Sequence, residues 1–560
     1  MKRWWYGLLV LVMVAVTGCS GGKSNSSGSP SPAGDTKSSA SPAASAATSA
    51  TPAAGKFIEL TAWSSIAPPQ GLLTSKASDT KVGLSIAKKS GVSFTVNYTQ
   101  GDKEQNFNLR LASKDWEDVI WTDSINFDWT EKLLKAGAII PLDNYFTQPD
   151  KYPNLAKIPK EVLDNYRYSD GHIYQFPAGW YEDPNSIYGY WAAAGWYVNP
   201  TTLAAVNMKT EDLTSLDAFE NYLKAVKAAK LKDKNGNEII PMSAGKELRF
   251  WKTVATAFGV TTAGNGFEQQ ANGSFLHYRD DPRLVQALTW LNKLNREGLL
   301  DAEIASQADE QLQQKLTNQR VALVADEAWR FWGTVTAGKG PVTDLLKIKF
   351  PMAPGVSKLG VMDTYNPLGT TGAFVTTRSK NPDAVAKYAD WSSEKGVSRG
   401  WEMYYGPYGE FWDWDPAAKK PNYVITDKEL SDAQQKGDYK KMNELGFSSI
   451  VNLAPFDLDL NYFNKAAEPQ LFWIFDMHKF YAPQQYIVKF KPYYNVKMPA
   501  DGVWLKNFGT LAKLDTEYFA KLILAKNDDD FKKIWEQYQT QLEKQGNWSA
   551  AKAEWIAAKK

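Results

Sequence analysis

The fold of this chain is decided by the stretch Asp118-Val-Ile-Trp-Thr-Asp-Ser-Ile-Asn-Phe-Asp-Trp-Thr-Glu-Lys-Leu-Leu-Lys-Ala-Gly-Ala-Ile-Ile-Pro-Leu-Asp143. Residues 119–121 form a short apolar run, which is the length of a buried strand rather than of a helix. A helix then buries Trp129 and the two leucines that follow it, and Gly137 ends that helix. Residues 138–142 read as the next extended segment. The order strand, loop, helix, strand predicts one βαβ unit.

The loop inside this unit carries the first candidate ligand contacts. It follows the apolar run and contains Trp121, Asp123, Ser124 and Asn126. In open α/β sheets, ligands bind beyond the carboxyl ends of the strands. An aromatic ring beside polar side chains at this position therefore predicts one wall of a ligand cleft.

The residues before this stretch extend the same pattern. Residues 57–63 and 92–98 predict two strands, the second from strict alternation of apolar and polar residues, and a helix is predicted within 75–90. Strands and helices that alternate in this way predict an α/β fold with a parallel sheet.

Composition limits the class of protein and of partner. With 560 residues, 43% hydrophobic and 22% charged, the chain should form two or more domain-sized units with full cores. A formal charge of +2 argues against nucleic acid as a partner. The chain has 22 tryptophans, of which Trp4 and Trp5 lie in the leader. The remaining tryptophans favour a ligand with flat apolar faces, such as sugar rings.

Cysteine and histidine usage predicts no metal centre. The single cysteine, Cys19, excludes an intramolecular disulfide and a cysteine-based metal site. His172, His277 and His478 lie far apart, without the spacing of a zinc motif. No nucleotide-binding loop or Gly-x-Ser-x-Gly motif occurs either, so no cofactor is expected.

The N-terminus has the pattern of an exported, anchored protein. Lys2 and Arg3 precede an apolar run of signal-peptide length that ends in Val16-Thr-Gly-Cys19, which resembles a bacterial lipobox. We predict a lipoprotein signal peptide over 1–18 and a lipidated Cys19. Residues 19–56 are rich in Ser, Ala and Pro and predict a disordered tether. The protein is thus expected on the extracellular face of a membrane.

Four segments together resemble a known family. They are Asp118-Val-Ile with the residues up to Asp143, Asp170-Gly-His-Ile-Tyr-Gln-Phe-Pro177, Leu213-Thr-Ser-Leu-Asp-Ala-Phe-Glu220, and 373–391. In this order, behind a lipobox, they are similar to the extracellular solute-binding proteins of ABC importers, family 1 and oligosaccharide type, in their long Gram-positive lipoprotein form.

This resemblance implies a fold, a function and partners. The fold would be a two-lobed, periplasmic-binding-protein-like α/β fold (a Venus flytrap) with discontinuous lobes and a helical C-terminal region. The first lobe would comprise 57–177 plus 366–415, and the second 178–365 plus 416–560. The protein would be a monomer that is not an enzyme. It would bind an oligosaccharide between the lobes and deliver it to permease subunits driven by separate ATPases.

Candidate ligand contacts are the aromatic and polar residues near strand ends and lobe crossings. Aromatic rings match the C–H face of a sugar, and carboxylate or guanidinium groups match its hydroxyls. Trp191, Trp196, Trp251 and Trp290 are expected in the core. The predicted ligand-binding residues are Trp63, Trp121, Asp123, Trp180, Glu182, Arg330, Trp332, Trp401, Glu402 and Tyr404.

Two further points have alternatives. The loop Asp233-Lys-Asn-Gly-Asn-Glu238 lies where relatives hold calcium, but it offers about four oxygens where calcium wants six or more. It therefore reads as an Asn-Gly turn. For the function, the alternatives are a secreted carbohydrate-active enzyme, a surface adhesin or scaffold, and a receptor for a non-sugar solute such as a peptide.

Overall fold

The computed structural model describes most of the chain from residue 57 onward. The described residues are 57–65, 68, 72–122, 127–168, 170–177, 194–245, 250–327, 345–365, 372–394, 402, 405–414, 423–436, 438–447, 480–484, 487–489, 493, 496–499 and 501–559. Cys19 and the predicted leader and tether lie outside them. In the described part, no helix combines the length and the apolar character that crossing a membrane requires.

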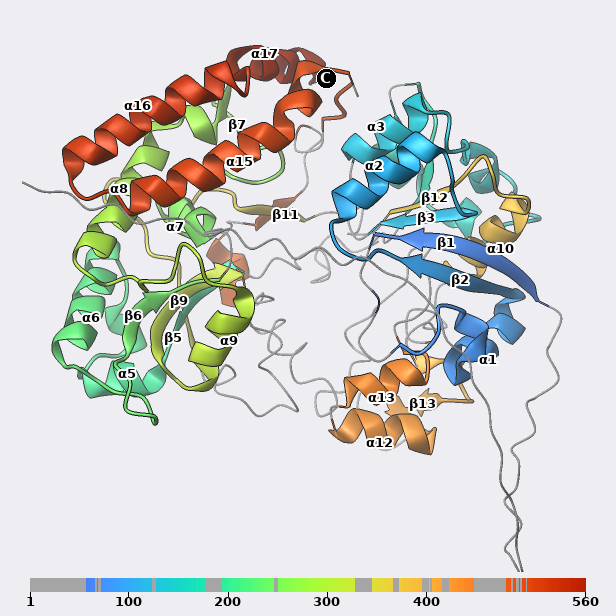
Figure 1. The fold of residues 1–560 in the computed structure, drawn as a ribbon, viewed down its shortest axis with the longest axis horizontal. Coiled ribbons are helices and arrows are strands. Elements are labelled where there is room, and N and C mark those ends of the chain that lie inside the picture. The colour runs from blue at the N-terminus through green and yellow to red at the C-terminus, as the bar shows by residue number, and fades with distance from the viewer. Residues whose placement is uncertain are drawn as a thin grey trace, which may run out of the picture. The chain divides into compact units, whose positions relative to one another are not determined.

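The first sheet has five strands from two distant parts of the sequence (Figure 1). Their order is β2 (Val92–Tyr98), β1 (Ile58–Ser64), β3 (Val119–Thr122), β12 (Gly372–Val375) and β4 (Gln175–Phe176). Strand β1 pairs in parallel with β2 and β3, whereas β12 runs antiparallel to both β3 and β4. The sheet is therefore complete only when residues 372–375 join it.

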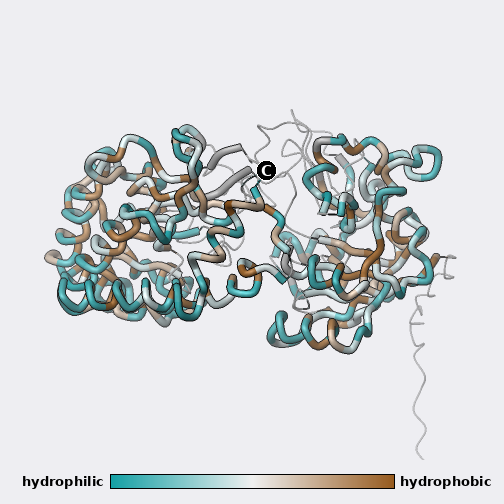
Figure 2. The backbone as a smooth tube through the Cα atoms, turned by 90° about the horizontal axis from the view of Figure 1, so that it is seen from above, coloured by the Kyte–Doolittle hydropathy of each residue, from teal (hydrophilic) through white to brown (hydrophobic). Residues whose placement is uncertain are grey.

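Helices cover both faces of this sheet. Helices α2 (Lys103–Ser113) and α3 (Phe127–Lys135) contribute to a core cluster with Ile120 and Phe374. Helices α1 (Lys81–Ser90) and α10 (Pro382–Ser392) contribute to a second cluster with Trp121 and Ala373. Neighbouring residues of a strand point to opposite faces, so these are the cores of the two faces. Figure 2 shows hydrophobic and hydrophilic residues alternating along the chain.

The second sheet has four strands. Their order is β10 (Leu346–Ile348), β5 (Ala194–Val198), β9 (Val321–Glu327) and β6 (Ile240–Ser243). Strand β5 is antiparallel to β9 and β10, and β6 is parallel to β9. The helices that surround this sheet are α5 (Pro200–Ala205), α6 (Leu216–Ala228), α7 (Phe250–Ala257), α8 (Pro282–Arg296) and α9 (Asp309–Thr317).

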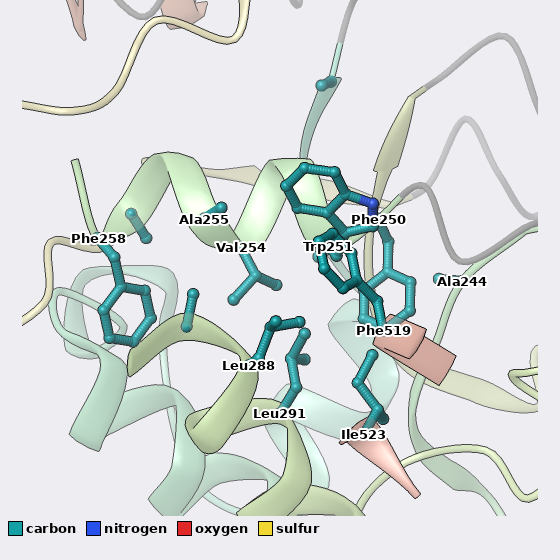
Figure 3. Packing of buried hydrophobic residues seen from close by; sticks show 14 of the residues in the cluster. Ala244, Phe250, Trp251, Val254, Ala255, Phe258, Leu288, Leu291, Phe519 and Ile523 are labelled. Carbon is teal, nitrogen blue, oxygen red and sulfur yellow. The ribbon is translucent and has the colours of Figure 1, made fainter. Parts of the chain in front are cut away.

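The C-terminal helices complete the core of the second sheet. They are α15 (Val503–Ile523), α16 (Asp528–Lys544) and α17 (Trp548–Ala558). Figure 3 shows side chains of α7 and α8 meeting Phe519 and Ile523 of α15, and all belong to one cluster. The hairpin β7 (Phe267–Gln269) and β8 (Phe275–His277) is tied to them, because Phe267 stacks on Trp555 with ring centroids 3.6 Å apart.

Smaller elements complete the described chain. Strand β11 (Asp363–Tyr365) pairs in parallel with β15 (Ile487–Lys489), and β13 (Trp412–Trp414) pairs antiparallel with β14 (Tyr423–Ile425). Helix α4 (Lys160–Tyr166) lies between β3 and β4 in sequence. Short 3-10 turns occur at 77–79, 143–146, 155–157, 210–212, 278–280 and 482–484.

The predicted class is confirmed, with two differences in detail. Helices α12 (Lys428–Lys436) and α13 (Tyr439–Glu444) pack on the first core through Leu430 and Met442, although the sequence division assigned 416–560 to the second lobe. Residues 138–142 do not form a full strand. They make one antiparallel bridge, Ile139 to Thr376, because the chain turns into the 143–146 helix directly afterwards.

Candidate functional site

The loops of the first sheet gather at one edge. Strands β1 and β3 end there at Ser64 and Thr122, with Ser64 opposite Trp121. Strand β12 begins there, because Gly372 lies opposite Thr122, and β4 ends one row earlier at Phe176, opposite Ala373. Segments 123–126, 178–193 and 366–371 therefore attach at the same edge, the carboxyl end of the parallel strands. This is the edge where α/β sheets bind ligands.

The second sheet has an equivalent edge. Strand β9 ends at Glu327 opposite Ala194, the first residue of β5. Gly245, just past the end of β6, donates its backbone N–H to Asp326 Oδ2 at 2.6 Å. Segments 178–193, 246–249 and 328–344 therefore attach at this edge. Segment 178–193 thus connects the carboxyl edge of one sheet directly to that of the other.

Seven of the predicted ligand contacts lie outside the described residues. Five of them belong to segments that leave these two edges, since they fall within 123–126, 178–193 and 328–344. The seven are Asp123, Trp180, Glu182, Arg330, Trp332, Trp401 and Tyr404.

Trp63 lies in the core between the first sheet and its helices. Its side chain is 1% exposed, and its ring centroid lies 5.9 Å from Trp129 and 6.2 Å from Trp116. The Arg110 guanidinium lies over the same ring, 5.4 Å from its centroid. Protein groups therefore surround the indole faces that a sugar would need, and we leave Trp63 out of the proposed binding surface.

Glu402 has an internal partner in the structure. The residue is 1% exposed and forms an ion pair with Lys89 of α1. Its Oε1 also accepts the backbone N–H of Tyr408 at 2.9 Å. A buried carboxylate that is held by a cation and a backbone N–H fixes the 402–408 turn against α1, so we also leave Glu402 out of the proposed binding surface.

Trp121 lies at the carboxyl edge of the first sheet, and its role as a ligand contact stays a prediction. It is the last residue but one of β3, is 7% exposed and packs in the cluster with Phe176 and Ala373. Its indole Nε1 is buried and has no hydrogen-bond partner in the described part of the chain. An unpaired buried donor costs about 1–3 kcal/mol, which makes this N–H a group that gains from a ligand acceptor.

Gln175 is a polar residue that the sequence reasoning did not single out. It is fully buried on β4, in the row that Ile120 and Phe374 form across the sheet. Neither its amide oxygen nor its amide nitrogen has a partner among the described residues. The signal in the sequence was one amide between aromatic residues in Tyr174-Gln-Phe176.

Buried polar groups stabilise the second sheet edge. Asp326 is buried and its Oδ1 accepts the N–H of Glu327 at 2.7 Å, in addition to its bond with Gly245. Ser243 donates to Asp301, which also accepts from Lys315 Nζ at 2.7 Å. These bonds fix the points where segments 246–249 and 328–344 begin.

The loop with the sequence of a partial calcium site forms a closed turn. Asp233 Oδ1 accepts the backbone N–H groups of Asn235 and Asn237 at 2.8 and 2.9 Å, and Gly236 has a φ of 82°. The predicted Asn-Gly turn is therefore present. In the described residues, no group of three or more His, Cys, Asp or Glu side chains is placed to hold a metal ion.

A lysine near α3 has a perturbed pKa. Lys497 Nζ lies over the Tyr168 ring, 4.7 Å from its centroid. Burial lowers the pKa of Lys497 to about 8, against an opposing effect of Glu131. The pKa of Glu131 is itself raised, first by burial and then by Asp170. The pair adds a pH-dependent contribution to stability near neutral pH.

Comparison with known proteins identifies the fold. No protein-family model and no curated protein sequence matches the chain. Among solved structures, one similar protein is the ABC-transporter substrate-binding protein FusA of S. pneumoniae, solved as an EF-hand mutant in complex with fructo-nystose. The match covers 90% of this chain and 99% of FusA, with 18% sequence identity and a TM-score of 0.65. An HMO-binding, ABC-transporter-associated solute-binding protein from Bifidobacterium longum infantis covers 90% and 100%, with 17% identity and a TM-score of 0.64.

The alginate-binding protein AlgQ2 matches equally well. It covers 90% of this chain and 98% of its own, with 18% identity and a TM-score of 0.64. The chain therefore has the fold of the oligosaccharide-type solute-binding proteins. The predicted two-lobed α/β class, with lobes built from separate parts of the sequence and a helical C-terminal region, is confirmed.

Proposed function

We propose that this chain is an extracellular solute receptor that binds an oligosaccharide and delivers it to the permease of an ABC transporter. The observation that carries the proposal is the similarity over 90% of the chain to binding proteins whose names include fructo-nystose, HMO and alginate. The sheet topology supports it, because segment 178–193 joins the carboxyl edges of two separate sheets.

The proposed ligand surface consists of residues at these edges and, in addition, of Trp401 and Tyr404. It comprises Trp121 on the first sheet together with Asp123, Trp180, Glu182, Arg330, Trp332, Trp401 and Tyr404 in the segments beyond the described residues. Ligand binding is expected to favour one relative position of the lobes, to the extent that the ligand binds that position more tightly. The protein is expected to bind the sugar without cleaving it.

We further propose that Cys19 carries a lipid that holds the protein at the membrane. The support is the apolar leader that ends in Val16-Thr-Gly-Cys19, followed by a polar segment up to residue 56. Metabolic labelling with a palmitate analogue tests this. The parent should be labelled and should fractionate with membranes, and Cys19→Ser should be unlabelled and released.

A thermal-shift screen tests the receptor function. The probes are kestose, fructo-nystose, alginate oligosaccharides and the glycan Man5GlcNAc, with a mixed peptide library as the non-sugar arm. A ligand at a concentration of 100 times its Kd stabilises the folded state by about 2.7 kcal/mol and therefore raises Tm. Stabilisation by a sugar without new reducing ends supports the proposal. Stabilisation by peptides alone, or turnover of a sugar, would refute it.

A further inference from the structure

Five described tryptophans have a buried indole N–H without a partner in the described part of the chain: Trp116, Trp121, Trp196, Trp290 and Trp555. Of these, Trp121 lies on β3, one residue from the carboxyl edge of the first sheet. Other tryptophans donate within the protein. Trp129 donates its Nε1–H to Glu104 at 2.7 Å, and Trp412 donates to the Gly406 carbonyl at 2.8 Å. Trp548 donates to Asp280 at 3.0 Å. The Nε1 of Trp121 is buried with no such partner among the described residues.

The Trp121 side chain is packed in the core, but the residue lies close to the edge of the first sheet. The ring belongs to the core cluster that also contains Ala373 and Phe176, its neighbours across the sheet. Its faces are therefore used in packing. Only Thr122 stands between Trp121 and segment 123–126, so Trp121 lies next to the edge where the loops of this sheet attach, and its Nε1 is buried.

Neighbouring polar groups at this edge are already used. Ser65 donates its backbone N–H to the Trp121 carbonyl at 3.0 Å, and Thr122 Oγ1 donates to the Gly372 carbonyl at 3.3 Å. These bonds hold the ends of β1, β3 and β12 together. The indole N–H is left as a donor without an acceptor inside the described part of this edge.

We propose that the indole N–H of Trp121 donates a hydrogen bond to a hydroxyl oxygen of the bound sugar. This inference rests on the proposed function and assigns one contact within it. The ring serves as a packed wall that fixes the direction of the N–H, rather than as a stacking platform. A hydroxyl suits this site because it accepts from Trp121 and still donates to another group.

The test compares two tryptophan-to-phenylalanine variants of the full-length protein. Trp121→Phe removes the donor and keeps an aromatic ring. Trp116→Phe is the matched control, because Trp116 is 6% exposed, has a buried Nε1 without a partner in the described chain, and precedes the amino end of the same strand. Affinity is measured by titration calorimetry with whichever of kestose, fructo-nystose, alginate oligosaccharides or Man5GlcNAc stabilises the parent.

We expect Trp121→Phe to weaken Kd about tenfold, the usual contribution of one hydrogen bond. Trp116→Phe should leave Kd unchanged. In ¹⁵N-labelled protein, the indole resonance that is missing from the Trp121→Phe spectrum should shift in the parent when sugar is added.

Three results would overturn the inference. Equal affinity of Trp121→Phe and the parent means that the N–H makes no ligand contact. Equal weakening by both variants means that aromatic packing, not the donor, supports binding. An indole resonance that does not move with saturating sugar means that the sugar does not contact the N–H. If no probe sugar stabilises the parent, the proposed function fails, and this inference fails with it.

Discussion

Asp515→Asn should destabilise the second lobe strongly, because Asp515 is the centre of a buried network. Arg279 donates to it from Nε at 3.0 Å and from Nη2 at 2.6 Å. Tyr278 and Tyr538 donate their hydroxyls to the same carboxylate at 2.6 and 2.5 Å. The Arg279 and Asp515 side chains are almost completely buried. These contacts join the 278–280 turn to α15 and α16.

The magnitude follows from burial and charge. Asp515→Asn leaves the Arg279 charge buried without its counter-ion, and breaking a buried pair costs about 3–5 kcal/mol. The matched control is Glu517→Gln in the same helix, which breaks the exposed pair with Lys521. An exposed i,i+4 pair contributes only about 0.3–0.5 kcal/mol.

Urea unfolding followed by tryptophan fluorescence measures both variants. We expect the midpoint of Asp515→Asn to fall far below that of Glu517→Gln, with an unchanged slope. The double variant Arg279→Met/Asp515→Asn should recover much of the loss, because it removes the unpaired charge and keeps an amide oxygen that accepts from the Tyr278 and Tyr538 hydroxyls. Similar midpoints for Asp515→Asn and Glu517→Gln would refute the reasoning.

Three further predictions concern single positions. Gln175→Met removes two unpaired buried groups and should raise the free energy of unfolding by about 1–3 kcal/mol; a lower Tm would show that the amide has a partner. The pKa of Lys497 is lowered in the folded protein, so the unfolded state binds more protons between pH 8 and 10.5. Lys497 therefore destabilises the parent below pH 8, and the free energy of unfolding of the parent should rise as the pH increases from 8 to 10.5. Lys497→Met should therefore be more stable than the parent at pH 7, by about 1–2 kcal/mol after allowance for partial exposure, and the difference should shrink by pH 10 in paired melts. Gly360→Ala would place a Cβ 1.9 Å from the Val260 carbonyl oxygen and should lower Tm, whereas Gly509→Ala, in open space on α15, should raise stability by about 0.5–1 kcal/mol.

Local sequence patterns predicted most of the elements. The bounds of the alternating segment Val92–Tyr98 match those of β2, which pairs along its whole length with β1. Asp281 caps α8 and Pro282 occupies its first turn, and both residue preferences act within one helical turn of the sequence. These signals depend on neighbours in sequence, so they could be predicted, whereas the extended segment 138–142 forms only one bridge.

The residues of the candidate site were harder to predict, because whether a side chain is free to bind a ligand depends on residues distant in sequence. Trp63 is core rather than exposed because α2 and α3 bring Phe107 and Trp129 against it. Glu402 is used internally because Lys89, more than 300 residues away in sequence, reaches it. No periodicity in the sequence around either residue contains that information.

The strand order of the first sheet has a consequence for biosynthesis. Strand β4 ends at residue 176, but β12, its only strand partner in the described chain, begins at residue 372. Ribosomes add about 5–20 residues per second, so the gap corresponds to roughly 10–40 seconds of synthesis. Throughout that interval, β3 has one unpaired side and β4 has no strand partner among the described strands. Export in an unfolded state and release outside the membrane would allow the whole sheet to form at once, whereas retention in the cytoplasm would expose these edges to aggregation.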